Sequence, residues 1–191
     1  MNKVKFGLRN VVYAKMTYNE EERRYTYATP VSIPGAVNLS LSPSGDSNDF
    51  YADDIIYFAD SNNNGYEGDL EIAIIPDSFK KDILGETEDA NKVLFENAED
   101  KTNPFALGFE IQGDQSGRRT WLYNCVATRP NQNGATKETS KTPSTDTLTI
   151  KAMPHPDNKD VKAVITNSET TKAAYDSFFT EVYEKSDVPT A

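Results

Sequence analysis

The chain has 191 residues, with ten Tyr and nine Phe among them, so one domain can bury a sizeable core without a disulfide or a structural metal. Thirty acidic against twenty basic residues give a net charge of -10, and neither sign forms long runs, so the chain should on average repel DNA and is not expected to read a DNA sequence. Cys125 is the single cysteine, so no disulfide can form within the chain, and we expect it in a strand as a small apolar residue.

Runs of β-branched and aromatic residues bounded by turn residues predict strands along most of the chain. In AVNLSLS the alternation is strict, with Val37, Leu39 and Leu41 on one face, which is typical of a half-buried antiparallel strand. The segment GDQSG at 113–117 predicts a hairpin between two long strands. The predicted strands lie at 11–18, 36–42, 55–59, 70–75, 92–96, 104–112, 118–129, 147–153 and 160–166.

Two segments have helical signals instead. A short helix is predicted at 77–84, with Asp77 or Ser78 as its N-cap and Gly85 where it stops. A second helix is predicted at 168–184, where apolar residues recur at helical spacing. We expect this stripe to pack on an open sheet face rather than to bind a partner or a membrane. The stripe consists of Tyr175, Phe178, Phe179, Val182 and Tyr183.

These elements predict a mainly β fold with one or two flanking helices, in a single domain over 1–191. Residues 1–7 are expected to form an N-terminal arm, and the polar, aperiodic segment 130–145 a flexible loop. The first ten residues lack the apolar stretch of a signal peptide, and no run approaches the length of a membrane span. We therefore expect a protein that is made in the cytoplasm and has no membrane anchor.

The segment DSNNNGYEGDLE at 60–71 has the spacing of a calcium loop. An EF-hand needs a helix on either side of this loop, whereas both flanks have strand patterns, so we interpret the segment as a hairpin tip in which Asn and Gly supply positive φ. Weak calcium binding without helices stays open as the alternative. Its ligands would be Asp60, Asn62, Asn64, the Tyr66 carbonyl and Glu71.

Residue patterns for catalysis are absent. His155 is the only histidine, and the prolines on either side of it in MPHPD predict a surface turn rather than a catalytic base. Asp53 and Asp54 would point to opposite faces of a strand, and we interpret them as one solvated and one hydrogen-bonding carboxylate. The sequence therefore predicts no enzyme, no catalytic residue and no cofactor.

The segment FYADDIIYFADSNNNGYEGDLEIAIIPDSF at 50–79, together with KVKFGLRNVVYA near the N-terminus, resembles the major tail proteins, or tail tube proteins, of phages of Gram-positive bacteria with long non-contractile tails. The resemblance covers nearly the whole chain. Its most specific block runs from Tyr51 through Asp53 and Asp54 to the NGYEG segment at 64–68 and then to the strand that ends in Ile75-Pro76-Asp77.

The resemblance implies a tail-tube-like antiparallel β-sandwich or barrel whose copies close into hexameric rings. The rings stack around a tape measure protein to form a tube through which double-stranded DNA is ejected without sequence recognition. Tail terminator and tail-tip proteins would be further partners, and the protein would belong to the virion tail after assembly in the host cytoplasm. Some members carry an extra immunoglobulin-like domain, which is not expected here.

Assembly is expected to depend on exposed stretches next to strands, and 1–7 and 42–49 fit this description. Part of the acidic excess is expected to line the lumen of the tube. A calcium- or glycan-binding adhesion module and, less favoured, an enzyme with a carboxylate pair remain as alternatives. The residues nominated for assembly are Met1, Lys3, Lys5, Phe6, Ser44, Asp46 and Asn48.

Overall fold

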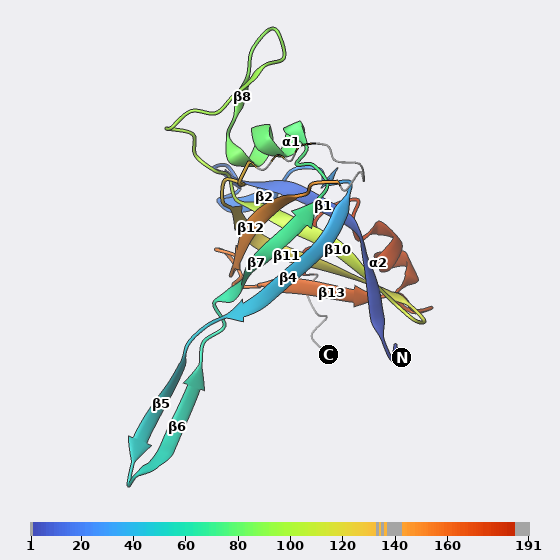
Figure 1. Ribbon diagram of the computed structural model, residues 1–191. Coiled ribbons are helices and arrows are strands. Elements are labelled where there is room, and N and C mark those ends of the chain that lie inside the picture. The colour runs from blue at the N-terminus through green and yellow to red at the C-terminus, as the bar shows by residue number, and fades with distance from the viewer. Residues whose placement is uncertain (1, 133, 135, 137–142, 186–191) are drawn as a thin grey trace.

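Strands dominate the computed structural model, which describes residues 2–132, 134, 136 and 143–185 (Figure 1). In this described part, nine strands form one antiparallel sheet in the order β2-β1-β10-β11-β12-β7-β4, with β3 beside β1 and β13 beside β11. The predicted mainly β fold with flanking helices is thereby confirmed. The strands of this sheet are β1 (Lys5–Asn19), β2 (Arg24–Tyr27), β3 (Val31–Ser32), β4 (Ala36–Ser44), β7 (Gly65–Ile72), β10 (Phe105–Gly113), β11 (Gly117–Ala127), β12 (Asp146–Met153) and β13 (Lys162–Thr166).

The other strands within the described residues form two separate hairpins, and the helical segments are short. One hairpin pairs β5 (Ser47–Ala52) with β6 (Ile55–Ser61), and the other pairs β8 (Thr87–Glu88) with β9 (Leu94–Phe95). Helix α1 (Asp77–Phe79) continues into the π-helical turn η1 (Lys80–Leu84), and α2 comprises Lys172–Ser177. Gly85 ends η1 in the left-handed conformation, at φ 85°, as its position in the sequence predicts.

The sheet curls because β11 has different neighbours along its length. Its first half pairs with β13, with Arg118 opposite Thr166, and its second half pairs with β12, with Asn124 opposite Met153. Strands β4 and β1 contact each other without pairing, although they are far apart in the strand order. In Figure 1, β7 and β4 lie in front of β10 and β11. The result is a sandwich-like, partly open barrel.

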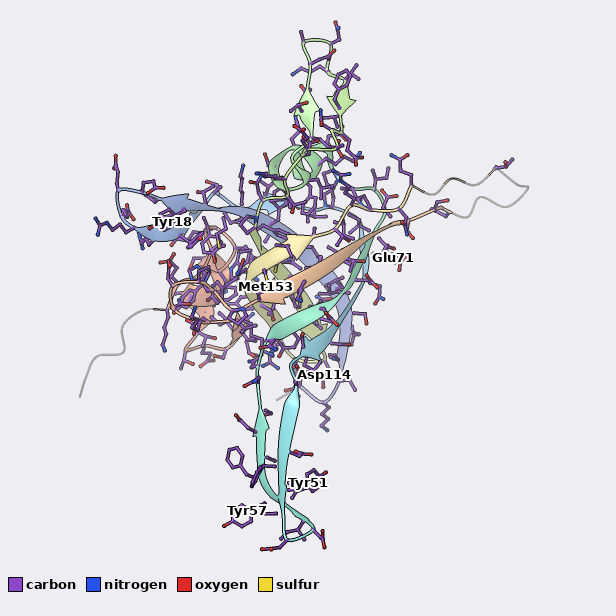
Figure 2. All side chains as sticks on the ribbon, turned by 90° about the vertical axis from the view of Figure 1, so that its left-hand side faces the viewer. Tyr18, Tyr51, Tyr57, Glu71, Asp114 and Met153 are labelled. Atoms are coloured by element: carbon purple, nitrogen blue, oxygen red, sulfur yellow. The ribbon has the colours of Figure 1, made fainter. Side chains whose placement is uncertain are left out.

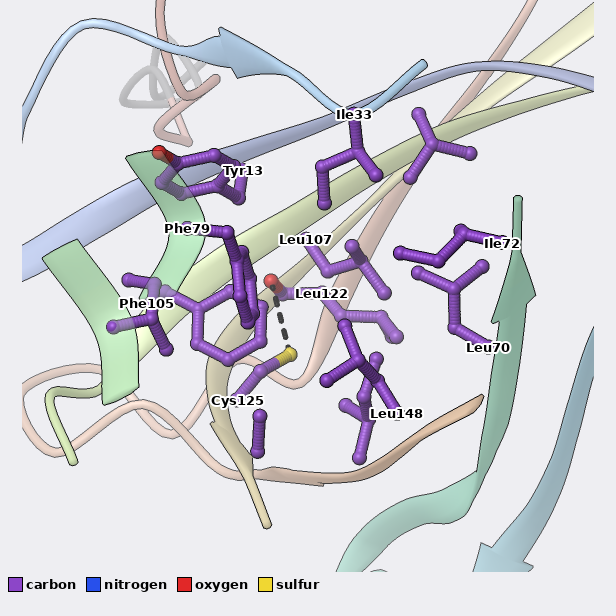
Figure 3. Packing of buried hydrophobic residues seen from close by; sticks show 14 of the residues in the cluster. Tyr13, Ile33, Leu70, Ile72, Phe79, Phe105, Leu107, Leu122, Cys125 and Leu148 are labelled. Carbon is purple, nitrogen blue, oxygen red and sulfur yellow. Dashed lines mark hydrogen bonds between the residues drawn. The ribbon is translucent and has the colours of Figure 1, made fainter. Parts of the chain in front are cut away.

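The main core lies between these layers and is closed at one end by α1 and η1 (Figure 3). Phe79 packs edge-on against Tyr13, with ring centroids 5.1 Å apart, and against Phe105 at 5.4 Å. The Tyr13 hydroxyl donates a hydrogen bond of 2.8 Å to Asp82 of η1. Each fully buried side chain of this size contributes roughly 2–3 kcal/mol of transfer free energy, so the short helical cap is firmly held.

A second cluster lies on the opposite face of β10 and β11, beneath the C-terminal segment. Phe178 and Val182 are buried there and Phe179 packs against them, while Tyr175 is buried beside Arg119 of β11. The predicted packing of the stripe on the sheet is thus confirmed for these four residues, whereas Tyr183 is 38% exposed.

The predicted helix over 168–184 is wrong in extent, because α2 ends at Ser177. Beyond Ser177 the backbone forms a tighter i→i+3 turn, in which Thr180 N donates to the Ser177 carbonyl at 2.9 Å. Trp121 Nε1 donates to the Phe178 carbonyl at 2.7 Å and ties this turn to β11.

The segments expected to be loose are in part built into the sheet. Lys5 and Phe6 pair with Gly113 and Gln112, so residues 5–7 are not a free arm but the start of β1. The stretch 42–49, read as a loop, instead contains the end of β4 and the start of β5. Of the loop 130–145, part lies outside the described residues, and none of its described residues is in a helix or strand.

Candidate assembly surface

The β5–β6 hairpin is the most prominent projection from the body (Figures 1 and 2). It continues the β4–β7 pair, because Asn64 N donates to the Ser44 carbonyl at 2.9 Å and Asn62 N donates to the Asp46 carbonyl at 3.1 Å. Gly45 permits this close approach, since a Cβ there would lie 1.8 Å from the Asn62 carbonyl oxygen. We call residues 46–61 the hairpin arm.

The tip of the arm is at Asp53 and Asp54, and two interpretations of the sequence are therefore wrong. Both residues have positive φ, 52° and 61°, as a two-residue type I′ turn requires, so they are turn residues and not neighbours within a strand. Aspartate tolerates this left-handed region better than most residues. The segment 60–71 is consequently not a hairpin tip but the junction where the arm joins the body.

Large apolar side chains cover the arm and are exposed to solvent. Tyr57 is 71% exposed and Tyr51 63%, and Figure 2 shows both projecting from the arm at a distance from the body. A two-stranded hairpin is marginally stable alone in water, and exposed apolar patches of this kind mark interaction sites. The exposed large apolar residues of the arm are Phe50, Tyr51, Ile55, Ile56, Tyr57 and Phe58.

The charged side chains of the arm are all negative. Between 46 and 61 the sequence has five aspartates and no Lys or Arg. Within the described residues β5 pairs only with β6, so the outer edge of each strand has unpaired backbone groups. The arm is thus an acidic, aromatic hairpin with two unpaired edges, and none of the other described residues covers its apolar side chains. The aspartates are Asp46, Asp49, Asp53, Asp54 and Asp60.

The candidate calcium ligands do not converge. Asp60 lies on β6, whereas Glu71 lies near the end of β7, opposite Asn38 and Thr147. The seven extended residues from Gly65 to Glu71 span roughly 20 Å, and Glu71 accepts a hydrogen bond of 2.6 Å from the Thr145 hydroxyl. No group of three potential metal-ligating His, Cys, Asp or Glu side chains occurs in the part of the chain that is described.

The residues nominated for assembly fall in two places. Ser44, Asp46 and Asn48 lie along the base of the arm, whereas Lys3 and the β1 residues Lys5 and Phe6 lie beside β10. Met1 is outside the described residues. Sequence reasoning missed the apolar residues of the arm itself, although FYADDIIYF contains the available signal: a DD turn pair between two apolar runs.

A buried ion network ties β1, β10, β11 and α2 together on the body. Glu110 is fully buried and accepts hydrogen bonds from Arg9, from Asn10 Nδ2 at 3.0 Å and from Arg119 Nε at 3.0 Å. The Arg119 guanidinium lies 4.1 Å above the Tyr175 ring. Burial by itself raises the pKa of Glu110, but these hydrogen bonds outweigh it and hold the pKa below its usual value.

His155 is buried, at 6% exposure, which corrects the expected surface position. Its ring packs against Tyr25, Tyr27 and Tyr123, and its Nδ1 accepts a hydrogen bond of 3.2 Å from the Asp157 amide. The turn that the prolines predict is present at 156–158. Packing by tyrosine rings gives this histidine a structural role.

Cys125 lies in β11 and is fully buried, as expected. Burial raises the pKa of its thiol to about 12, so the reactive thiolate is scarce at neutral pH. No helix among the described residues has the length and hydropathy needed to cross a membrane.

A family model described as phage tail tube protein matches residues 1–120, which include the arm, the core strands up to the middle of β11 and the η1 cap. No curated protein matches the chain significantly.

Proposed function

Because the chain belongs to the phage tail tube protein family, we propose that it is the repeating subunit of a tail tube, built from stacked hexameric rings. Its structural role in the tail tube follows from the family. Beyond this role, we propose that the subunits form hexameric rings, that the rings stack, and that DNA passes through the lumen.

The hairpin arm is the observation that carries the proposal. It exposes Phe50 and Phe58, each 60% exposed and opposite each other across the two strands, in a chain whose body has its own buried core. Such a ribbon gains stability only from a surface outside its own molecule. One heterologous contact of this kind, repeated by rotation, closes a ring, and repeated by translation it stacks rings.

The proposal extends to the other components of a tail. A tape measure protein would fill the tube during assembly, tail terminator and tail-tip proteins would bind its two ends, and double-stranded DNA would pass without sequence recognition. The net charge of -10 supports passage without adhesion, because phosphates are repelled by an acidic surface. Assembly in the host cytoplasm and residence in the virion tail complete the proposal.

The tube has more support than the alternatives. An adhesion module with a calcium site would need Asp60 and Glu71 near one ion, and they lie on different parts of an extended hairpin. An enzyme with a carboxylate pair would need a cleft at Asp53 and Asp54, and these form an exposed turn at the end of the arm.

Negative-stain electron microscopy of the purified full chain tests the proposal. At high protein concentration we expect tubes or six-fold rings, with a sedimentation coefficient that rises with concentration. A chain that is monomeric at every concentration, and that stays so when the other tail components are added, would contradict it.

A further inference from the structure

A groove of about 560 Å³ opens in the body between the start of β1, the β4–β7 pair and the β11–β13 pair. It lies where β13, rather than β12, pairs with the first half of β11, and within the described residues β13 pairs with no second strand that would continue the sheet to β7. Its floor is apolar and continuous with the main core. The floor is formed by Leu41, Phe109, Ile111, Leu122 and Val164.

The rim of this groove has positive charge. Four cationic side chains line it, and no Asp or Glu does, in a chain with a net charge of -10. Among the described residues, Lys3, Lys5 and Arg118 have no carboxylate within ion-pair distance. Lys162 lies 4.5 Å above the Tyr66 ring and donates a hydrogen bond to its hydroxyl. The rim therefore offers three free cations beside an apolar floor.

The hairpin arm has the complementary chemistry. Its aromatic and isoleucine side chains are exposed, and its charges are all negative. Exposed large aromatic residues are the usual anchors of an interface, and charges of opposite sign around them fix its register.

The arm of the same molecule cannot fill this groove. It leaves the body at Ser44 and Gly65 and points away from it (Figure 1). The seven residues of β6 carry the tip roughly 20 Å from that point. An arm that fills the groove must therefore come from another molecule.

We propose that the groove receives the hairpin arm of a second copy of this chain, with the aromatic residues on the apolar floor and the aspartates against the rim cations. The inference rests on the proposed tube, since it names the surface of the neighbouring subunit that receives the arm. DNA is the competing occupant of a cationic groove, but an apolar floor gives a phosphate backbone nothing to bind.

Reversing charge on each surface tests the pairing. The groove variant Lys5→Glu/Arg118→Glu and the arm variant Asp49→Lys/Asp60→Lys each place like charges together, and each should raise the protein concentration needed for assembly at least about tenfold. An equimolar mixture of the two should assemble near the wild-type concentration, because every contact then joins opposite charges. Thermal melts of each variant show that both fold.

Disulfide trapping gives a second readout that does not depend on charge. The native Cys125 is buried and does not compete. A mixture of Tyr57→Cys and Val164→Cys single variants should form a crosslinked dimer on mild oxidation of assembled material. Tyr57→Cys mixed with Val37→Cys is the matched control, because Val37 is exposed on β4 outside the groove and should not crosslink.

Three results would overturn the inference. The charge-reversed variants could fold, yet their mixture could fail to assemble, or tubes could form without the Tyr57–Val164 crosslink. The groove variant could also assemble normally but lose binding to a short DNA duplex, which would make DNA the occupant of the groove. In each of these cases the tube itself still stands. If the wild-type chain forms no rings or tubes at all, the proposed function fails instead.

Discussion

At the scale of single residues, the side chain of Glu110 joins several elements of the fold. It is a fully buried carboxylate whose partners come from two other strands, β1 and β11, and one of these partners, Arg119, also donates to the Tyr175 carbonyl of α2. Removing one member of a buried ion network leaves the other charges uncompensated. The network therefore fixes the position of α2 against the sheet.

We predict that Glu110→Gln lowers the free energy of unfolding at pH 7 by about 3 kcal/mol. Because the folded-state pKa is lowered, the contribution of Glu110 is complete above the usual carboxyl pKa of 4.5 and is lost as the pH falls below it. The difference between the variant and the wild type should thus shrink in denaturant melts below about pH 4.

Glu67→Gln, at an exposed position on β7, is the control and should change the stability little at either pH. A Glu110→Gln deficit of the same size at pH 7 and pH 3 would contradict the assigned ion network.

At the scale of elements, the hairpin arm separates folding from assembly. Among the described residues, its side chains belong to neither buried cluster, and the backbone hydrogen bonds at residues 44–46 and 62–64 join it to the body. The start of β1 is different, since residues 5 and 6 pair with β10. Deleting residues 1–7 would therefore disturb the sheet as well as assembly.

Replacing residues 47–61 by an Asn-Gly turn should leave a folded protein that does not assemble. We expect a change in thermal midpoint below about 2 °C, because an exposed element contributes roughly 0.5 kcal/mol or less. Sedimentation velocity should give a monomer at concentrations where the full chain assembles.

A milder version substitutes the cross-strand pair, as Phe50→Ser/Phe58→Ser, with Ala59→Ser on the same hairpin as the control. Normal tubes from the double variant would contradict the role of the aromatic surface.

At the scale of the whole molecule, charge is unevenly distributed. The groove concentrates free cations in an acidic chain, and the arm concentrates aspartates. If arm and groove cover each other in the tube, the surface left for the lumen retains the acidic excess.

We predict that the lumen of assembled tubes is acidic, so that DNA meets a repulsive wall and slides. Single-particle imaging of tubes, followed by a count of charged side chains facing the channel, measures this. A basic lumen would refute the prediction.

The strands and the turn chemistry were determined by the sequence. Alternation in AVNLSLS, the GDQSG hairpin and Gly85 are local signals, because side-chain period and backbone dihedral preferences act over a few residues. The predicted face holds for Leu39 and Leu41 but is wrong for Val37, which is exposed because the register of β4 shifts at that residue. The aromatic stripe near the C-terminus was equally visible. Its helix is shorter than the periodicity predicts, since α2 ends at Ser177 and a tighter i→i+3 turn follows.

Only the tertiary structure decided which apolar side chains of these elements are buried and which are exposed. An apolar run such as IIYF has the same pattern whether it is buried in its own chain or exposed on an arm, since periodicity reports which residues are apolar and not what covers them. The pairing of β1 with β10 joins residues about a hundred positions apart, and the pairing of β11 with β13 beside the groove joins residues 40 to 48 positions apart. Such contacts depend on the packing of the whole sheet, and no local signal encodes them.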